Sequence, residues 1–346
     1  MNKELKNMIE ILNARVFDYK GGDFIGLADG RMGLCIYFYY ISRIYKSKEY
    51  NKMAELLMGE ILEQVANMKE YDIESGLAGI GLGIDYLVEN EYVKGNINDI
   101  LEDVDDILFK QICNLKKKDD DDISLQLQLL YYFIVRLKKQ NKNSENEYFF
   151  REVLIEIINS ISEKIYSFFL EEQISFTLKN ISNISLLVLS HFGELYKDKI
   201  KQILKEISFC TLSKLPVLHS NRLYLLYAMD KVIKKIETKG WNEHMKLLVR
   251  EIDVEYIIEK ELADKLYFSN GLPAIYFLLS GLGGYFSYNQ ARKYKGLIIN
   301  KIENSSVWNT LLDNEGYLKL KSSLFTGFTG ISLLLHIHYN NENRLN

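Results

Sequence analysis

The sequence has few cysteines and few prolines, and each scarcity excludes a class of protein. Its 346 residues contain three cysteines, Cys35, Cys113 and Cys210, which are far apart in the chain. Three cysteines so far apart do not form a disulfide framework, and none of them belongs to a Cys-x-x-Cys motif of the kind that binds zinc. The two prolines, Pro216 and Pro273, are fewer than the turns of a β-rich chain of this length need. The composition therefore favours helix.

The chain also lacks an excess of basic charge and a long apolar run. Its 43 Lys and Arg residues are balanced by 47 Asp and Glu residues, a formal net charge of −4, so we expect no nucleic-acid partner. No run approaches the roughly 18 to 20 apolar residues of a membrane-spanning helix. The segment Met1 to Glu10 lacks the uncharged core of a signal peptide. We therefore expect a folded cytoplasmic protein with no integral membrane segment.

Apolar residues recur at helical spacing in the segments 53–65 and 153–165. The clearest loops are Lys116 to Asp122, which contains a run of aspartates, and Lys139 to Glu147, which contains no apolar residue. Neither loop has the character of a domain boundary. The sequence therefore predicts a single domain over residues 1–346.

An internal repeat is the most informative feature of the sequence. Pairs of glycines three positions apart, each followed by an apolar run, begin at Gly30, Gly76 and Gly327. A fourth copy begins at Gly271, with Ala274 in place of the second glycine. The interval from Gly76 to Gly271 leaves room for three further units that have lost their glycines, which we place near Leu125, Ile181 and Asn221.

Each unit has the pattern of a glycine turn, an apolar helix, a polar turn and an amphipathic helix. Segments 80–88 and 331–338 are typical of the apolar helix, and segment 99–112 is typical of the amphipathic one. An apolar helix is buried on most sides and an amphipathic helix on one stripe, which predicts an inner and an outer layer. The glycines allow close backbone approach and permissive φ values. Seven such hairpins could close into a ring or form an open solenoid, and periodicity alone leaves both open.

Two of the turns carry the motif of a known family. The second unit reads Ser75-Gly76-Leu77-Ala78-Gly79-Ile80-Gly81-Leu82 and continues into Asp85-Tyr86-Leu87, and the last unit reads from Ser323 to Leu333 as SLFTGFTGISL. This pattern resembles the lanthionine synthetase C-like, or LanC-like, peptide cyclases over nearly the whole chain, from about Phe24 to Tyr339. The resemblance implies an all-α fold, an α/α toroid of seven inner and seven outer helices.

The resemblance also implies a chemistry, the addition of a peptide cysteine thiolate to a dehydrated serine or threonine. Zinc serves this step because a coordinating thiol loses its proton. In the family the ligands are a cysteine of the fifth unit and a Cys-His pair of the sixth. Here the first falls at His219 and the pair falls at Ser269 and Asn270. Serine and asparagine are not usual zinc ligands, so we expect no zinc and no other cofactor.

No other residues offer a replacement for the zinc ligands. The three cysteines fall inside helical segments rather than at the turns. His336 and His338 are two positions apart and cannot share a helix face, so we expect them to be ordinary residues near a helix end.

The other family positions are altered as well. The catalytic histidine expected before the fourth-unit turn falls at Asn180, which cannot exchange protons near neutral pH. A tyrosine expected beside the fifth-unit ligand falls at Ser220, and an aspartate ahead of the third unit matches Asp121. We therefore expect no catalytic residue, and a polar substrate-binding mouth formed by Asp121, Asn180, His219, Ser220, Ser269 and Asn270.

Three functional classes remain open. The first, which we favour, is a LanC-like protein of a lanthipeptide-type pathway that binds a precursor peptide or a partner modification enzyme without cyclising it. The second is an active cyclase, or another enzyme, that uses a remodelled pocket with His219 as a lone base. The third is an unrelated helical interaction scaffold. Arg31 and Arg222 could bind an acidic peptide or could be solvated surface residues.

Overall fold

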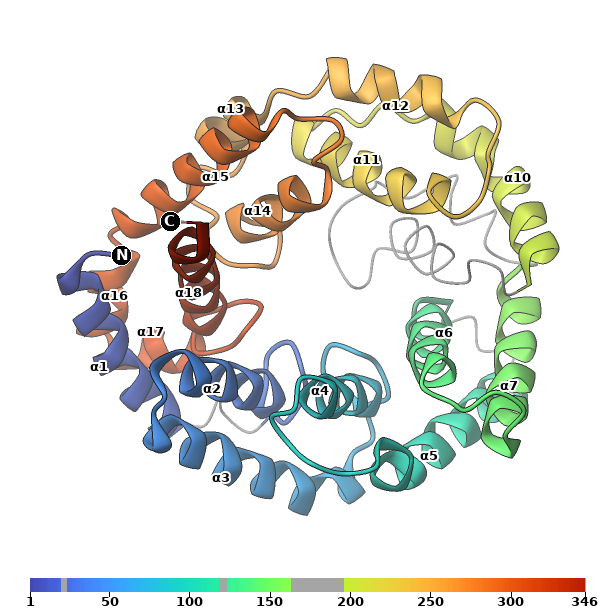
Figure 1. Cartoon of the computed structure of the whole chain (residues 1–346), viewed down its shortest axis with the longest axis horizontal. Coiled ribbons are helices and arrows are strands. Elements are labelled where there is room, and N and C mark those ends of the chain that lie inside the picture. The colour runs from blue at the N-terminus through green and yellow to red at the C-terminus, as the bar shows by residue number, and fades with distance from the viewer. Residues whose placement is uncertain (20–23, 118–122, 163–195, 346) are drawn as a thin grey trace. The chain divides into compact units, whose positions relative to one another are not determined.

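The computed structural model describes residues 1–19, 24–117, 123–162 and 196–345, and helices are the only regular secondary structure in those ranges (Figure 1). The described chain divides into two compact units. The first comprises residues 1–102, 264–276 and 292–346, and the second comprises residues 103–263 and 277–291. The single domain over residues 1–346 stays a prediction.

The helices of the first unit are α1 (Lys3–Tyr19), α2 (Arg31–Tyr45), α3 (Lys48–Gln64), η1 (Val65–Asn67), α4 (Leu77–Glu89), α16 (Val307–Asp313), α17 (Glu315–Leu320) and α18 (Phe328–Leu345). Those of the second unit are α6 (Ile123–Lys138), α7 (Glu145–Ser162), α10 (Lys197–Ser213), α11 (His219–Ile233), α12 (Trp241–Arg250), α13 (Val254–Tyr256) and the π-helix η2 (Ile257–Glu261). Three helices have residues in both units: α5 (Ile97–Lys117), α14 (Leu272–Gly281) and α15 (Tyr288–Glu303).

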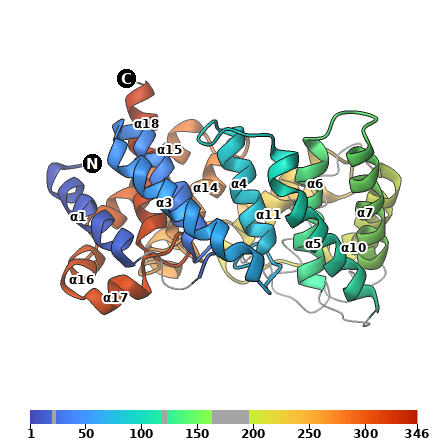
Figure 2. The ribbon, with the colours of Figure 1, turned by 90° about the horizontal axis from the view of Figure 1, so that it is seen from below.

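The repeat predicted from the glycine pairs is present. A helix begins one residue after each of Gly30, Gly76, Gly271 and Gly327. The helix that follows the turn is deeply buried, as α2 is, whereas its hairpin partner α3 buries a single stripe formed by Ala54, Leu57 and Ile61. The pairs α2–α3, α6–α7 and α11–α12 pack against each other. Helix α3 runs beside α2 in Figure 1 and lies in the foreground of the turned view in Figure 2. These contacts confirm the predicted hairpin of one apolar and one amphipathic helix.

Close backbone approach explains the glycines, and permissive φ does not. Gly30 and Gly76 have φ values of −132° and −105°, which any residue can adopt, so that part of the prediction is wrong. A Cβ atom on Gly76 would lie 2.5 Å from the backbone nitrogen of Asp72, and one on Gly79 would overlap the carbonyl oxygen of Ile73. The turn backbone therefore occupies the space that a side chain would need.

Main-chain hydrogen bonds link four of the turns in the first unit. The amide of Ser269 donates to the carbonyl of Phe325 at 2.9 Å, the amide of Phe325 donates to the carbonyl of Ala28 at 2.9 Å, and the amide of Ala28 donates to the carbonyl of Glu74 at 2.8 Å. Each of these four residues stands two positions before the first glycine of its repeat. We call this series the turn ladder. It joins the sixth, seventh, first and second repeats in that order.

The two ends of the chain pack together within the first unit. Helix α1 contacts α16 and α17, and α18 contacts α2. The Tyr37 hydroxyl on α2 donates to Asn13 on α1 and lies 2.7 Å from the Ser332 hydroxyl on α18. The Arg15 guanidinium on α1 donates to the carbonyl of Leu312 at 2.6 Å. The last repeat is therefore joined to the first by buried polar contacts as well as by the turn ladder.

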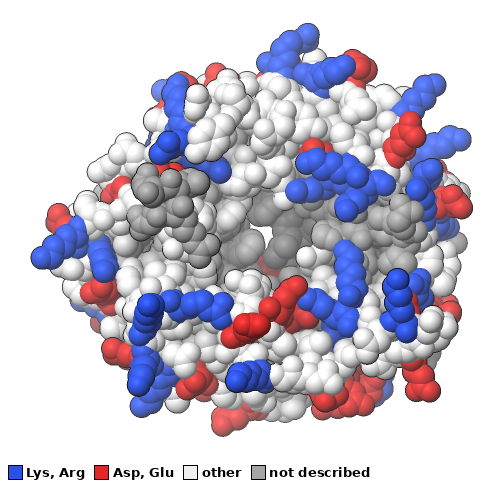
Figure 3. All heavy atoms as spheres, in the orientation of Figure 1, with Lys and Arg blue, Asp and Glu red and all other residues white. Residues whose placement is uncertain are grey.

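Charged side chains of both signs are interspersed on the face shown in Figure 3. This mixture agrees with the balanced composition of 43 basic and 47 acidic residues. None of the described helices combines the length and the hydropathy that a bilayer crossing requires.

Candidate functional site

The structure describes four of the six predicted site residues. Asp121 and Asn180 lie outside the described residues. His219 and Ser220 are the first two residues of α11 in the second unit. In the first unit, Ser269 and Asn270 immediately precede Gly271, and α14 begins at the next residue.

Helix α11 begins earlier than the sequence predicts. The sequence predicts the degenerate turn at Asn221, but in the structure the last extended residue is Leu218 and the helix starts at His219. The guanidinium of Arg222 fixes the segment before the helix, because it donates to the carbonyls of Pro216 at 2.7 Å and of Glu251 at 2.6 Å. Arg222 is therefore a structural residue of this turn. The sequence leaves Arg222 open as a solvated surface residue or as a ligand of an acidic peptide, and these contacts match neither role.

A carboxylate from the same unit caps the start of α11. Glu261, the last residue of η2, accepts the backbone N–H of His219 at 2.7 Å and that of Ser220 at 2.9 Å. The first N–H groups of a helix have no partner within the helix, and a negative charge there is favoured by the helix dipole. The buried Ser220 is thus held by its backbone, and the helix terminus already has an internal anionic ligand.

The His219 ring is held in one tautomer. Its Nδ1 atom accepts the backbone N–H of Asp253 at 3.0 Å, and the ring packs on Tyr256 with 5.2 Å between centroids. A neutral imidazole that accepts at Nδ1 carries its proton at Nε2. As it lies in the structure, His219 therefore presents an N–H donor at Nε2 and has no free lone pair there.

These residues do not fit the zinc site that the resemblance implies. To offer Nε2 to a metal, His219 would have to move its proton to Nδ1 and lose the bond from Asp253. Within the described ranges, no group of three or more His, Cys, Asp or Glu residues is placed to hold a metal ion. A catalytic zinc site needs three protein ligands. One imidazole with its ring nitrogen already engaged falls short of that requirement.

The cysteines do not supply the missing ligands. Cys35 lies on α2, Cys113 on α5 and Cys210 on α10, as their helical spacing predicted. The buried Cys35 thiol donates to the carbonyl of Ala54 at 3.4 Å, and burial raises the pKa of this thiol. Burial of this kind makes a thiol inert rather than ligating.

Ser269 and Asn270 have structural roles in their turn. The Ser269 amide is the first donor of the turn ladder, and Asn270 has φ of 56°, in the left-handed region. Asparagine is one of the few non-glycine residues that tolerates this region. The turn geometry therefore accounts for the residue found at position 270.

The C-terminal histidines are interior residues of α18, so the prediction that they lie at a helix end is wrong. His336 is buried, donates from Nδ1 to the carbonyl of Ser332 at 2.6 Å and accepts from the Tyr45 hydroxyl at 2.8 Å. His338 lies 3.0 Å from the Tyr276 hydroxyl. Both imidazoles are engaged in packing within the first unit.

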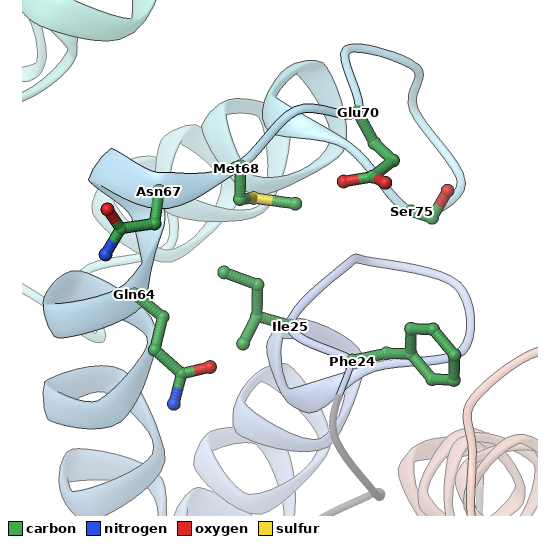
Figure 4. A pocket seen from close by; sticks show the side chains of 7 residues that line it. All are labelled: Phe24, Ile25, Gln64, Asn67, Met68, Glu70 and Ser75. Carbon is green, nitrogen blue, oxygen red and sulfur yellow. The ribbon is translucent and has the colours of Figure 1, made fainter.

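A cavity of about 470 Å³ lies at the turn end of the first unit, and the sequence does not predict it (Figure 4). We call it the turn cavity. Its lining residues come from the segment before Gly30, from the end of α3, from η1 and from the segment between η1 and Gly76, and all except Gln64 lie outside the stretches with helical spacing. They are Phe24, Ile25, Gln64, Asn67, Met68, Glu70 and Ser75.

Among solved structures, nisin cyclase is similar to this chain. The match covers 96% of this chain and 94% of that chain, with a TM-score of 0.65 and 14% sequence identity. The chain has the fold of nisin cyclase. The predicted class, an all-helical α/α toroid, and the resemblance to LanC-like proteins are confirmed at the level of the fold. No protein-family model and no curated protein sequence matches the chain.

Proposed function

We propose that this protein is a LanC-like protein of a lanthipeptide-type pathway that binds a precursor peptide or a partner modification enzyme and does not close thioether rings by a zinc route. The observation that carries the proposal is the state of His219. Its Nδ1 is engaged by Asp253 and its backbone by Glu261, so the residue at which the resemblance places a metal ligand serves the structure of α11.

The chemistry of ring closure supports the same proposal. Without a metal, a peptide thiol has a pKa of about 8.5, so only a few per cent is thiolate at neutral pH. A general base must have a free lone pair within reach of the proton that it removes. In His219 the proton is on Nε2 and the lone pair of Nδ1 is used, so the ring offers none in this arrangement.

The similarity to nisin cyclase supports a peptide as the ligand. The name of that protein states that it cyclises nisin, and this chain shares its fold over almost the full length of both chains. A shared fold alone does not carry a function across. We therefore propose that this protein binds a peptide, as a cyclase does, but does not catalyse its cyclisation.

Two measurements on the purified protein, without chelator treatment, test the proposal. We expect zinc far below one equivalent by elemental analysis. We also expect that free thiols of a dehydrated, cysteine-containing precursor peptide disappear only at the uncatalysed rate, while the same peptide binds saturably. An active lanthionine cyclase in the same assay is the positive control. Ring closure well above the uncatalysed rate that is abolished in His219→Ala would show a remodelled enzyme instead.

A further inference from the structure

The turn cavity is positioned by the first two glycine turns. Phe24 and Ile25 precede the first turn, Glu70 and Ser75 precede the second, and Gln64 ends α3. The backbone of this region is already paired, because the carbonyl of Phe24 accepts the amide of Arg31 at 3.0 Å and that of Glu70 accepts the amide of Leu77 at 3.1 Å. A ligand in the cavity would therefore be recognised by side chains.

The apolar lining includes one side chain that is open to solvent. Phe24 is 69% exposed, although phenylalanine is usually buried in a folded chain. Ile25 is buried beneath the opening and Met68 is half-buried, and Figure 4 shows Met68 across the cavity from Ile25 with Phe24 to one side. The flexible thioether of Met68 adapts its shape to a partner side chain. The apolar lining suits an aliphatic or aromatic side chain of a ligand.

Among the polar lining residues, Ser75 donates its hydroxyl to the Asp72 carboxylate at 3.2 Å, and the others have few partners within the described residues. The side-chain amides of Gln64 and Asn67 make no hydrogen bond there, and the Glu70 carboxylate has one long contact, with the backbone N–H of Lys69 at 3.4 Å. An amide side chain both donates and accepts, as the backbone of an extended peptide requires. The carboxylate adds a negative charge at the rim of the apolar surface.

The described lining favours a cationic ligand over an anionic one. Among the described residues that line the cavity, none is Lys or Arg, whereas a phosphate or nucleotide site needs cationic groups or a free helix N-terminus. A ligand with a basic group beside an apolar group can pair its charge with the Glu70 carboxylate and bury its apolar group against the apolar lining. The cavity volume of about 470 Å³ lies within the range of ordinary ligand sites.

We infer that the turn cavity docks an extended peptide segment in which an apolar side chain neighbours a lysine or arginine. The inference rests on the proposed function and names the surface and the sequence class for peptide binding. The apolar side chain packs against Phe24, Ile25 and Met68, and the cation pairs with Glu70. The amides of Gln64 and Asn67 bond to the peptide backbone.

Three terminally blocked pentapeptides test this inference. The first is acetyl-Gly-Leu-Lys-Phe-Gly-amide, the second has Glu in place of Lys, and the third has Ala in place of both Leu and Phe. The protein carries ¹³C-labelled methionine methyl groups, and Met68→Leu assigns the Met68 signal in the methyl NMR spectrum. We expect the first peptide to shift that signal saturably, and the other two to bind at least about tenfold more weakly.

Charge reversal provides the decisive variant. Glu70→Lys should weaken binding of the lysine peptide by about tenfold or more and should improve binding of the glutamate peptide. Glu70→Gln should weaken binding of the lysine peptide only. Glu102→Lys, at an exposed position on α5 outside the cavity, should change neither. Circular dichroism melting confirms that each variant is folded. Equal binding of the two charged peptides, or an unmoved Met68 signal, overturns the inference.

The same titration with a dehydrated precursor peptide separates the two proposals. If the precursor binds the wild-type protein and Glu70→Lys equally well, the turn cavity is not the docking site and the proposed function stands. If the precursor and all three pentapeptides fail to bind the wild-type protein, the peptide-binding function fails and the inference fails with it.

Discussion

The hydroxyl of Tyr37 lies 2.7 Å from the hydroxyl of Ser332, although 295 positions separate the two residues in the chain. The same Tyr37 hydroxyl donates to Asn13 at 2.8 Å, and all three side chains are buried. One phenol therefore connects α1, α2 and α18. The packing of the chain ends within the first unit depends on polar groups that have no access to water.

We expect Tyr37→Phe to destabilise the protein by about 1 to 3 kcal/mol, because it leaves the buried Asn13 oxygen and Ser332 hydroxyl without this partner. Equilibrium unfolding in urea measures the change. Tyr288→Phe is the matched control, since Tyr288 is 66% exposed and a surface change of this kind stays within about 0.5 kcal/mol. Equal effects of the two substitutions would contradict the structural role of Tyr37.

Stability should fall as the pH drops below about 6.5. Burial lowers the pKa of His336, and burial also lowers the pKa values of His244 and His338. Because the unfolded chain then takes up protons at a higher pH than the folded protein does, the stability is fully present above the unfolded pKa of about 6.5 and declines as the pH falls toward the folded values.

Urea midpoints between pH 8 and pH 5.5 test this dependence. The midpoint should decrease from pH 7 to pH 5.5, and the decrease should be smaller in His336→Gln, which cannot titrate. A midpoint that rises as the pH falls over that interval would show that the histidines do not control acid stability. An equal decrease of the midpoint in His336→Gln and in the wild-type protein would show that His336 does not contribute to it.

Two glycine-to-alanine substitutions should have opposite signs. Gly79→Ala should destabilise the protein by about 1 to 3 kcal/mol, because its methyl group would overlap the carbonyl oxygen of Ile73. Gly59→Ala should stabilise it by about 0.5 to 1 kcal/mol, because Gly59 lies inside α3 and a Cβ atom there meets nothing within 4 Å. Unfolding midpoints that shift in the same direction would refute the close-approach explanation.

Glu261→Gln should loosen the start of α11. The carboxylate charge at the helix terminus is lost, and one of the two acceptor oxygens becomes a donor, at a cost of about 1 to 2 kcal/mol. Amide hydrogen exchange of His219 and Ser220 should accelerate. Glu243→Gln is the control, because Glu243 lies in the first turn of the neighbouring α12 with its side chain exposed. Unchanged exchange in Glu261→Gln would show that the cap contributes nothing.

The repeat was predictable because its signal is local. Each intact turn needs glycine where two backbones meet, so Gly30, Gly76, Gly271 and Gly327 mark the helix starts within one residue. Helical spacing similarly predicted α3 and the described part of segment 153–165 in α7. The loop predicted over 139–147 is shorter in the structure, because α7 begins at Glu145.

The surroundings of the candidate site were not predictable because they depend on distant partners. Helix α11 starts at His219, capped by Glu261, 42 positions further on, and no local pattern announces that contact. The tautomer of His219 depends in the same way on the Asp253 amide. The turn cavity joins non-periodic segments of two repeats, so the properties of Phe24 and Glu70 become informative only once the fold brings them together.

The turn ladder is built entirely from main-chain atoms, and this has a consequence for how such a fold changes over time. Serine, phenylalanine, alanine and glutamate occupy the equivalent positions 269, 325, 28 and 74, and each makes the bonds of the ladder without using its side chain. A reactive side chain at this position can therefore be introduced or removed by one substitution while the backbone bonds persist. Side chains at these four positions are therefore exchangeable at little cost in stability, so the chemistry that a turn offers can change while the chain remains fully folded.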